Sequence, residues 1–115
     1  MYVFKKAREL ASDVISVTET FPKSETFNTV SQMRRAALSI VSNIAEGARR
    51  GSTPDFIRFL RISYGSCGEL GAQILVSRDA GWIDQADFDR LDKMIDDVSG
   101  LVWKLMEGVK RKKRR

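Results

Sequence analysis

The sequence predicts an all-α fold, an antiparallel up-down-up-down bundle of four helices in a single domain. Four amphipathic segments lie along the 115 residues, and each carries apolar residues every three or four positions, as the core-facing stripe of a helix does. The connections between the segments are short, which makes consecutive helices antiparallel. Alternating apolar and polar residues, the pattern typical of strands, are absent from the sequence.

The first two segments are separated by Pro22. The first is expected at about residues 2–21, and Pro22 ends it because the residue before a proline disfavours the helical conformation. The second is expected at about residues 26–50. It ends before Gly51, a residue suited to the left-handed conformation that follows many helices.

The third segment is expected to begin at Pro54 and to end near Gly81. Thr53 suits the capping position and Pro54 the first helical position. Three glycines repeat at three-residue spacing in its middle: Gly65, Gly68 and Gly71. Each interior glycine costs a helix about 1 kcal/mol relative to alanine. We expect close packing against the alanines of the second segment to compensate, with a ligand-binding or flexible role as the alternative.

The fourth segment is expected to start at Asp84, with Asp87 near the positive end of the helix dipole, and to run to about residue 109. A run of Lys and Arg follows it. We therefore expect a bundle over residues 1–109 and a basic C-terminal tail over residues 110–115. The tail consists of Lys110, Arg111, Lys112, Lys113, Arg114 and Arg115.

The net charge of +5 is unevenly distributed along the chain. The tail holds six positive charges, while residues 1–109 hold 14 basic and 15 acidic residues. Residues 34–61 are rich in arginine and residues 82–109 are rich in acids, which predicts one basic and one acidic side. A polycationic tail attracts phosphate polymers through counterion release, although a solubilising terminus is the alternative. The candidate nucleic-acid-binding residues are the tail and the cluster Arg49, Arg50, Arg58 and Arg61.

Histidine is absent, and Cys67 is the only cysteine. Zinc sites of the Cys/His type, Ser-His-Asp and Cys-His nucleophile systems and Glu-x-x-His di-iron bundles therefore each lack a ligand or a base. We expect no enzyme activity, no metal, no cofactor and no small-molecule substrate. Because the apolar runs are short and the first ten residues lack a signal-peptide pattern, we expect a cytoplasmic location without membrane contact.

A polar stripe runs along the second segment beside its apolar stripe. Its members are Gln32, Arg35, Ser39, Asn43, Glu46 and Arg50. A solvated face usually carries Lys and Glu, so the Ser and the Asn suggest contact with another helix. Because a buried polar group without a partner costs roughly 1–3 kcal/mol, we expect Ser39, Asn43 and Glu46 to pair with the third segment, at Ser66, Glu69 or an Arg beside them. Catalysis by Glu46 and Glu69 is the less favoured alternative.

Several large apolar side chains lie off the core stripes. The clearest are Phe59, Ile62, Trp82 and Trp103. Large exposed apolar patches mark interfaces, so we predict a homo-oligomer with Phe59, Ile62 and Trp103 at its contacts. A wider core stripe that covers them within one chain is the alternative.

The polar stripe belongs to a longer motif. The run Gln-Met-Arg-Arg-Ala-Ala-x-Ser-Ile-x-x-Asn-Ile-Ala-Glu-Gly at residues 32–47, followed by Phe-x-x-Phe-Leu at 56–60 and Gly-Ser-x-Gly-Glu-Leu at 65–70, resembles the bacterial four-helix-bundle family encoded in intervening sequences of 23S ribosomal RNA genes. The matching positions include Gln32, Arg34, Ser39, Asn43, Glu46, Gly47, Ser66 and Glu69. The family has no established catalytic residue to assign to them.

That family is similar, more remotely, to the accessory variability protein of diversity-generating retroelements, a basic bundle that associates with a reverse transcriptase and its RNA. The similarity implies a homopentamer with a central channel and suggests nucleic-acid binding. Our leading hypothesis is a non-enzymatic oligomeric bundle that binds RNA through the Arg cluster and the tail. The alternative is a protein-interaction scaffold that holds a partner such as a reverse transcriptase.

Overall fold

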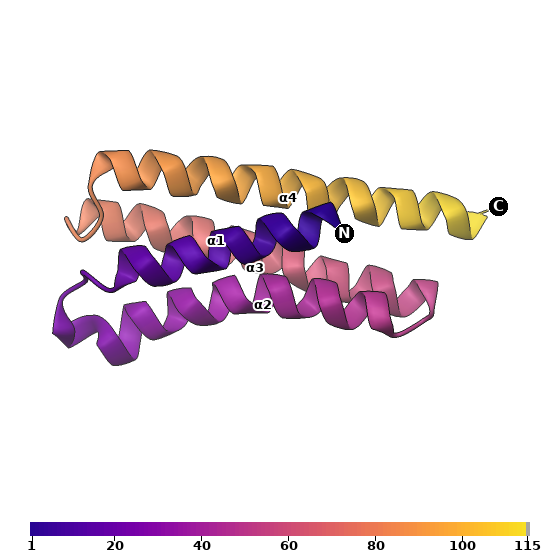
Figure 1. Ribbon diagram of the computed structural model, residues 1–115, viewed down its shortest axis with the longest axis horizontal. Helices are drawn as coiled ribbons and strands as arrows, with labels where there is room; N and C mark the ends of the chain where they lie inside the picture. Colours follow the sequence, from indigo (N-terminus) through magenta and orange to yellow (C-terminus); the bar gives the residue numbers. More distant parts are fainter. Residues whose placement is uncertain (115) are drawn as a thin grey trace.

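The computed structural model describes the backbone of residues 1–114 and the side chains of residues 1–112 (Figure 1). Its long helices are α1 (Tyr2–Thr18), α2 (Ser31–Arg49), α3 (Thr53–Asp79) and α4 (Gln85–Arg114). A short 3₁₀ turn η1 (Lys23–Glu25) and a π turn η2 (Thr26–Val30) lead into α2. Consecutive helices run in opposite directions and the described residues contain no strand, so the predicted antiparallel four-helix bundle is confirmed.

The helix ends follow the local chemistry of the connections. Gly51 and Gly81 adopt φ values of 80° and 81°, the left-handed conformation that glycine reaches without strain. Ser52, and not Thr53 as predicted, caps α3, because the Ser52 Oγ accepts a hydrogen bond from the Asp55 amide at 3.3 Å. The prediction that the first helix extends to residue 21 was also wrong, since α1 ends at Thr18.

A continuous apolar core lies along the axis of the bundle. The largest fully buried side chains come from all four helices: Leu10, Val14, Met33, Ile40, Ile44, Leu60, Leu70, Ile74, Leu91, Val98 and Val102. Polar contacts join helices at the margin of this core. Arg34 of α2 donates to the Thr18 hydroxyl at 3.0 Å and to the Ile15 carbonyl at 3.2 Å, which links α2 to α1.

The tightest helix contact lies where α2 meets α3. A Cβ added to Gly47 would lie 2.9 Å from the Phe59 Cβ and 3.0 Å from the Phe56 Cδ1, distances too short for real Cβ contacts. Only glycine allows the two helices to approach this closely. The predicted packing of the three glycines of α3 against α2 was wrong, because a Cβ added to any of them meets nothing within 4 Å. These glycines are Gly65, Gly68 and Gly71.

The fourth helix does not end at residue 109. It continues as a helix to Arg114, so the predicted basic tail is a helical extension over its described part. Figure 1 shows this end of α4 reaching past the start of α1 and past the α2–α3 connection. Arg115 and the side chains of Lys113 and Arg114 lie outside the described residues. None of the helices in residues 1–114 is both long and apolar enough to cross a membrane.

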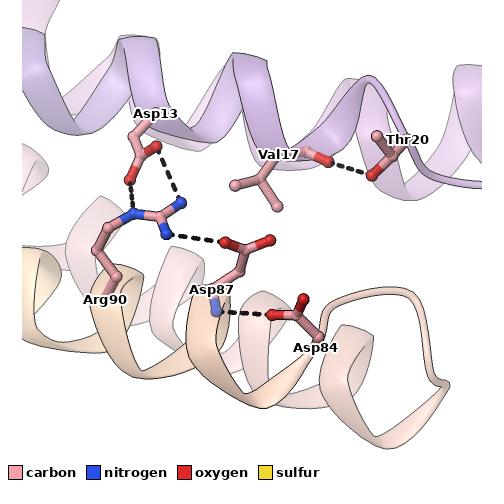
Figure 2. A network of polar contacts seen from close by, with 6 residues as sticks. All are labelled: Asp13, Val17, Thr20, Asp84, Asp87 and Arg90. Atoms are coloured by element: carbon pink, nitrogen blue, oxygen red, sulfur yellow. Dashed lines mark hydrogen bonds and ion pairs between the residues drawn. The ribbon is translucent and has the colours of Figure 1, made fainter.

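A polar network fastens α1 to the first turns of α4 (Figure 2). The Arg90 guanidinium donates to both carboxylate oxygens of Asp13, at 2.8 and 3.2 Å, and to Asp87 at 2.8 Å. These hydrogen bonds raise the pKa of Arg90. The Asp84 carboxylate accepts the Asp87 amide at 2.8 Å and so caps the start of α4. A single guanidinium thus connects the two helices that lie at opposite ends of the sequence.

We predict that Gly47→Ala lowers the free energy of unfolding by about 1–3 kcal/mol, because the added methyl group overpacks the contact with Phe56 and Phe59. The matched control is Gly68→Ala, which fills open space and is expected to be neutral or to stabilise by up to about 1 kcal/mol. Urea unfolding at low protein concentration measures both. Equal effects of the two substitutions would contradict the close approach at Gly47.

We also predict that Arg90→Ala lowers the free energy of unfolding by at most about 1 kcal/mol, since the pairs are solvent-exposed. Its effect on hydrogen exchange is expected to be local, with the amides of α1 exchanging faster while those of α3 keep their protection. Lys93→Ala is the control, because Lys93 pairs only with Asp97 of its own helix. Unchanged exchange in α1 would argue against Arg90 as the link.

Candidate nucleic-acid interface

One end of the bundle is basic. The N-terminus, the α2–α3 connection and the C-terminal part of α4 lie toward the same end (Figure 1). Residues 1–9, 46–61 and 104–112, which form this end, contain eleven Lys and Arg and four Asp and Glu. Residues 10–35 and 62–103 contain six basic and eleven acidic residues. The charges therefore separate along the long axis of the molecule, into a basic end and an acidic end. The sequence had predicted a basic side and an acidic side.

Two arginines of the predicted cluster are held around one aromatic ring. The guanidinium carbon of Arg50, just after α2, lies 5.1 Å from the centroid of Phe59, and that of Arg58, on α3, lies 4.5 Å from it. Arg50 also pairs with Glu46 at 3.1 Å and Arg58 with Asp55 at 3.8 Å. Cation–π contacts and ion pairs together hold two guanidinium groups near the Phe59 ring, one from the end of α2 and one from α3.

Phe59 is therefore not an exposed interface residue. Its exposed fraction is 9 %, because it packs on Gly47 and the two arginines cover it. Trp82 is half-buried, and the centroid of its ring lies 5.8 Å from that of Phe21. The alternative of a wider core stripe therefore holds for Phe59 and Trp82, whereas Ile62 and Trp103 stay exposed by 42 % and 48 %. The spacing of apolar residues along one helix cannot show that a glycine on the neighbouring helix leaves room for an aromatic ring.

Arg49 and Arg61, the other two members of the predicted cluster, are exposed and form no ion pair among the described residues. Arg49 is the last residue of α2, where a positive charge is favourable near the negative end of the helix dipole. Arg61 lies one turn after Arg58 on α3. The α2–α3 connection thus carries four guanidinium groups within the last turn of one helix and the first turns of the next.

Two amides at the start of α3 are occupied within the chain. The Ser52 Oγ accepts from the Asp55 amide at 3.3 Å, and the Ser52 carbonyl accepts from the Phe56 amide at 3.0 Å. The loop is therefore a helix cap, and the positive groups available here are the arginine side chains.

An aromatic pair adjoins the basic end of α4. The Trp103 ring lies 5.4 Å from that of Tyr64, and the Lys110 ammonium lies 5.9 Å from the Trp103 centroid and 3.3 Å from Glu107. Trp103 keeps 48 % of its surface exposed. Sequence reasoning found no aromatic residue among the tail charges, although the seven-residue spacing of Trp103 and Lys110 places both on one helix face.

The polar stripe of α2 pairs with α3 only in part. The predicted contact of Ser39 with Ser66 is confirmed at 2.9 Å, whereas Asn43 donates to the carbonyl and hydroxyl of Ser39 in its own helix, at 2.8 and 3.0 Å. Glu46 pairs with an arginine one turn on and Glu69 accepts from a glutamine one turn on, both within one helix. The predicted cross-helix pairing was wrong for these acids, because the stripe lies on an outer seam where water competes.

Groups with nucleophilic or metal-binding potential are scarce in the described structure. Burial raises the pKa of the Cys67 thiol to about 12, so the thiolate that reacts is not populated at neutral pH. Within the described residues, no three His, Cys, Asp or Glu side chains gather in a metal-binding arrangement. The basic end can attract anions through its exposed guanidinium and ammonium groups.

Comparisons with known proteins agree with the sequence motif. A family model described as 23S rRNA-intervening sequence protein matches residues 1–104. The fold is similar to the crystal structure of a protein of unknown function from the S23 ribosomal protein family of Bacteroides thetaiotaomicron. The two are 20 % identical, with 92 % of this chain and 96 % of that chain covered and a TM-score of 0.85. A search of curated proteins finds no match.

Proposed function

We propose that this chain, which belongs to the 23S rRNA-intervening sequence protein family, is a non-enzymatic RNA-binding bundle whose basic end contacts the phosphate backbone. The observation that carries the proposal is the separation of charge along the axis, with eleven basic and four acidic residues at one end. Phosphate contacts supply most of the sequence-independent affinity for nucleic acids. A surface that gathers cations from three parts of the chain is suited to that role.

The pair Arg50 and Arg58 supports a fixed geometry for part of this contact. Each guanidinium presents a planar fork that can bind two phosphate oxygens. Their contacts with Phe59 restrict the side chains before a ligand arrives, which reduces the entropy lost on binding. Neither ion pair is buried, so a phosphate competes with Glu46 or Asp55 for the guanidinium without leaving a charge stranded in the core.

The end of α4 supplies a second, more extended contact. Because α4 continues as a helix beyond the other elements, Lys110, Arg111 and Lys112 surround a single rod and can approach a polyanion from several sides. The expected readout is RNA shape and charge, with little dependence on base sequence.

Assembly forms part of the proposal. The ring of five subunits implied by the family resemblance stays a prediction. We assign its contacts to the exposed Trp103 with its neighbour Tyr64, and no longer to Phe59, which is buried, or to Ile62, which is exposed on another part of α3. A ring brings several basic ends to one RNA, which raises the effective concentration of each remaining contact.

The alternative is a protein scaffold. Its supporting observation is the acidic half of α4, where residues 84–97 hold six aspartates against Arg90 and Lys93. A scaffold would capture one protein with little dependence on salt, whereas RNA binding through phosphates weakens steeply as salt rises.

We predict that the chain binds structured and single-stranded RNA in gel-shift titrations at low salt. Replacing Arg50 and Arg58 by Ala should reduce the slope of log affinity against log salt by about 1.5, since each lost phosphate contact removes about 0.7–0.9. The same change should alter preference among RNA structures, because it removes oriented guanidinium groups. Deleting residues 110–115 should lower affinity for all polyanions alike.

The control is the double variant Lys23→Ala and Lys93→Ala, which removes two exposed cations from the acidic end and should leave RNA binding unchanged. Undetectable binding by the full chain at low salt would reject the proposal and favour the scaffold. Equal losses in the control and in the arginine variant would show attraction by net charge without a defined site.

Light scattering at tens of micromolar tests the ring. Five chains of 13.0 kDa give about 65 kDa, and Trp103→Ala is expected to shift the mass toward that of one chain. A wild-type protein that stays at 13.0 kDa would contradict assembly.

A further inference from the structure

The outward side of α3 is unlike the solvent face of an ordinary bundle helix. Between Arg61 and Arg78 the helix contains one charged residue, Glu69. Exposed positions of helices usually carry charges. We define the outer α3 face as Ile62, Gly65, Gly68, Ala72, Leu75 and Val76, all of which are exposed. The large apolar members expose 42 % (Ile62), 44 % (Leu75) and 61 % (Val76) of their surface.

Packing within the chain does not account for the glycines on this face. Glycine destabilises a helix interior relative to alanine, and a Cβ added to Gly65 or Gly68 meets nothing within 4 Å. Alanine would fit at both positions. A contact from outside the chain, in which two helix backbones approach closely, is a physical reason for small residues here.

The face has a two-fold pattern about its middle, between Gly68 and Glu69. Three pairs of residues at equal distances on either side of this point are alike or complementary, although Val76 has Arg61 as its counterpart. Gly65 corresponds to Ala72, Ile62 to Leu75, and Arg58 to Asp79. The side chains of Arg58 and Asp79 are exposed by 59 % and 68 %. If a second α3 lies antiparallel on this face, small residues meet at the centre and opposite charges meet at both ends.

We propose that the outer α3 face binds a second copy of this chain, with the two α3 helices antiparallel around a two-fold axis between Gly68 and Glu69. Charge over the whole molecule favours this occupant. An antiparallel pair sets the basic end of each copy beside the acidic end of the other. At the axis, each Glu69 lies level with Gly68 of the other copy, which has no side chain to oppose it.

The contact closes at two copies, because each copy uses the same surface. One helix pair buries less area than the roughly 1,200 Å² of a stable interface, so the pair is expected to exchange in the micromolar range. Pairing does not require RNA, although the pair and the proposed phosphate contact both use Arg58. Trp103, the proposed ring contact, lies on α4 and is not part of the outer α3 face.

Cysteine cross-linking tests the register. Seven residues separate Gly65 from Ala72, about 10 Å along a helix, and a disulfide needs Cα atoms within about 7 Å. Gly65→Cys alone and Ala72→Cys alone should therefore not form cross-linked dimers, while a mixture of the two should. Gly68→Cys alone should cross-link across the axis. The native Cys67 does not compete, because it is buried and its pKa is raised to about 12.

The matched controls are Ser42→Cys on α2 and Ala86→Cys on α4, both exposed and off the face. Under the same mild oxidation, non-reducing gels should show dimers of Gly68→Cys at least tenfold faster than control dimers, since pairing raises the effective concentration toward millimolar. Adding Ala72→Arg to Gly68→Cys should return the rate to that of the controls. No excess over the controls would overturn the proposal, as would self-cross-linking of Gly65→Cys equal to that of the mixture.

Discussion

The close approach of α2 and α3 at Gly47 is the contact on which the basic end depends. Without a side chain at this position, the backbone of α2 lies against Phe56 and Phe59, and the Phe59 ring is seated between two helices. Arg50 and Arg58 then reach the ring from opposite sides of the connection. A packing constraint at the margin of the core thereby orients two charged groups at the surface, and the proposed phosphate contact depends on both of them.

Unequal helix lengths shape the rest of that end. With 17 residues in α1 and 30 in α4, the rise of about 1.5 Å per residue leaves α1 roughly 20 Å shorter than α4. The C-terminal turns of α4 therefore project beyond the core, where Arg111 and Lys112 are exposed and their charges carry no cost of burial. The Arg90 network holds the opposite part of α4 to α1 and keeps the acidic turns within the bundle.

The sequence predicted the fold well, because apolar periodicity reports which face of each helix is buried. It also predicted the Ser39–Ser66 contact, which depends on small polar residues that recur on facing helices. It failed at Phe59 and at the glycines of α3 for one reason. Periodicity describes a helix alone, whereas burial of a ring or exposure of a glycine depends on the neighbouring helix. The helical tail was missed because the apolar stripe ends at Val109, whereas an established helix continues through Lys and Arg, which have good helix propensity.

The two proposed surfaces share Arg58 and otherwise lie on different parts of the molecule, and this separation has a consequence for RNA binding. The bundle is 50 Å long, with the basic end at one extreme and the outer α3 face along its side. In an antiparallel pair the two basic ends point in opposite directions and lie tens of ångströms apart, which exceeds the Debye length of about 8 Å at physiological salt. Their affinities for phosphate are then electrostatically independent. A pair would join two separate RNA segments, whereas a ring alone would gather its basic ends on one.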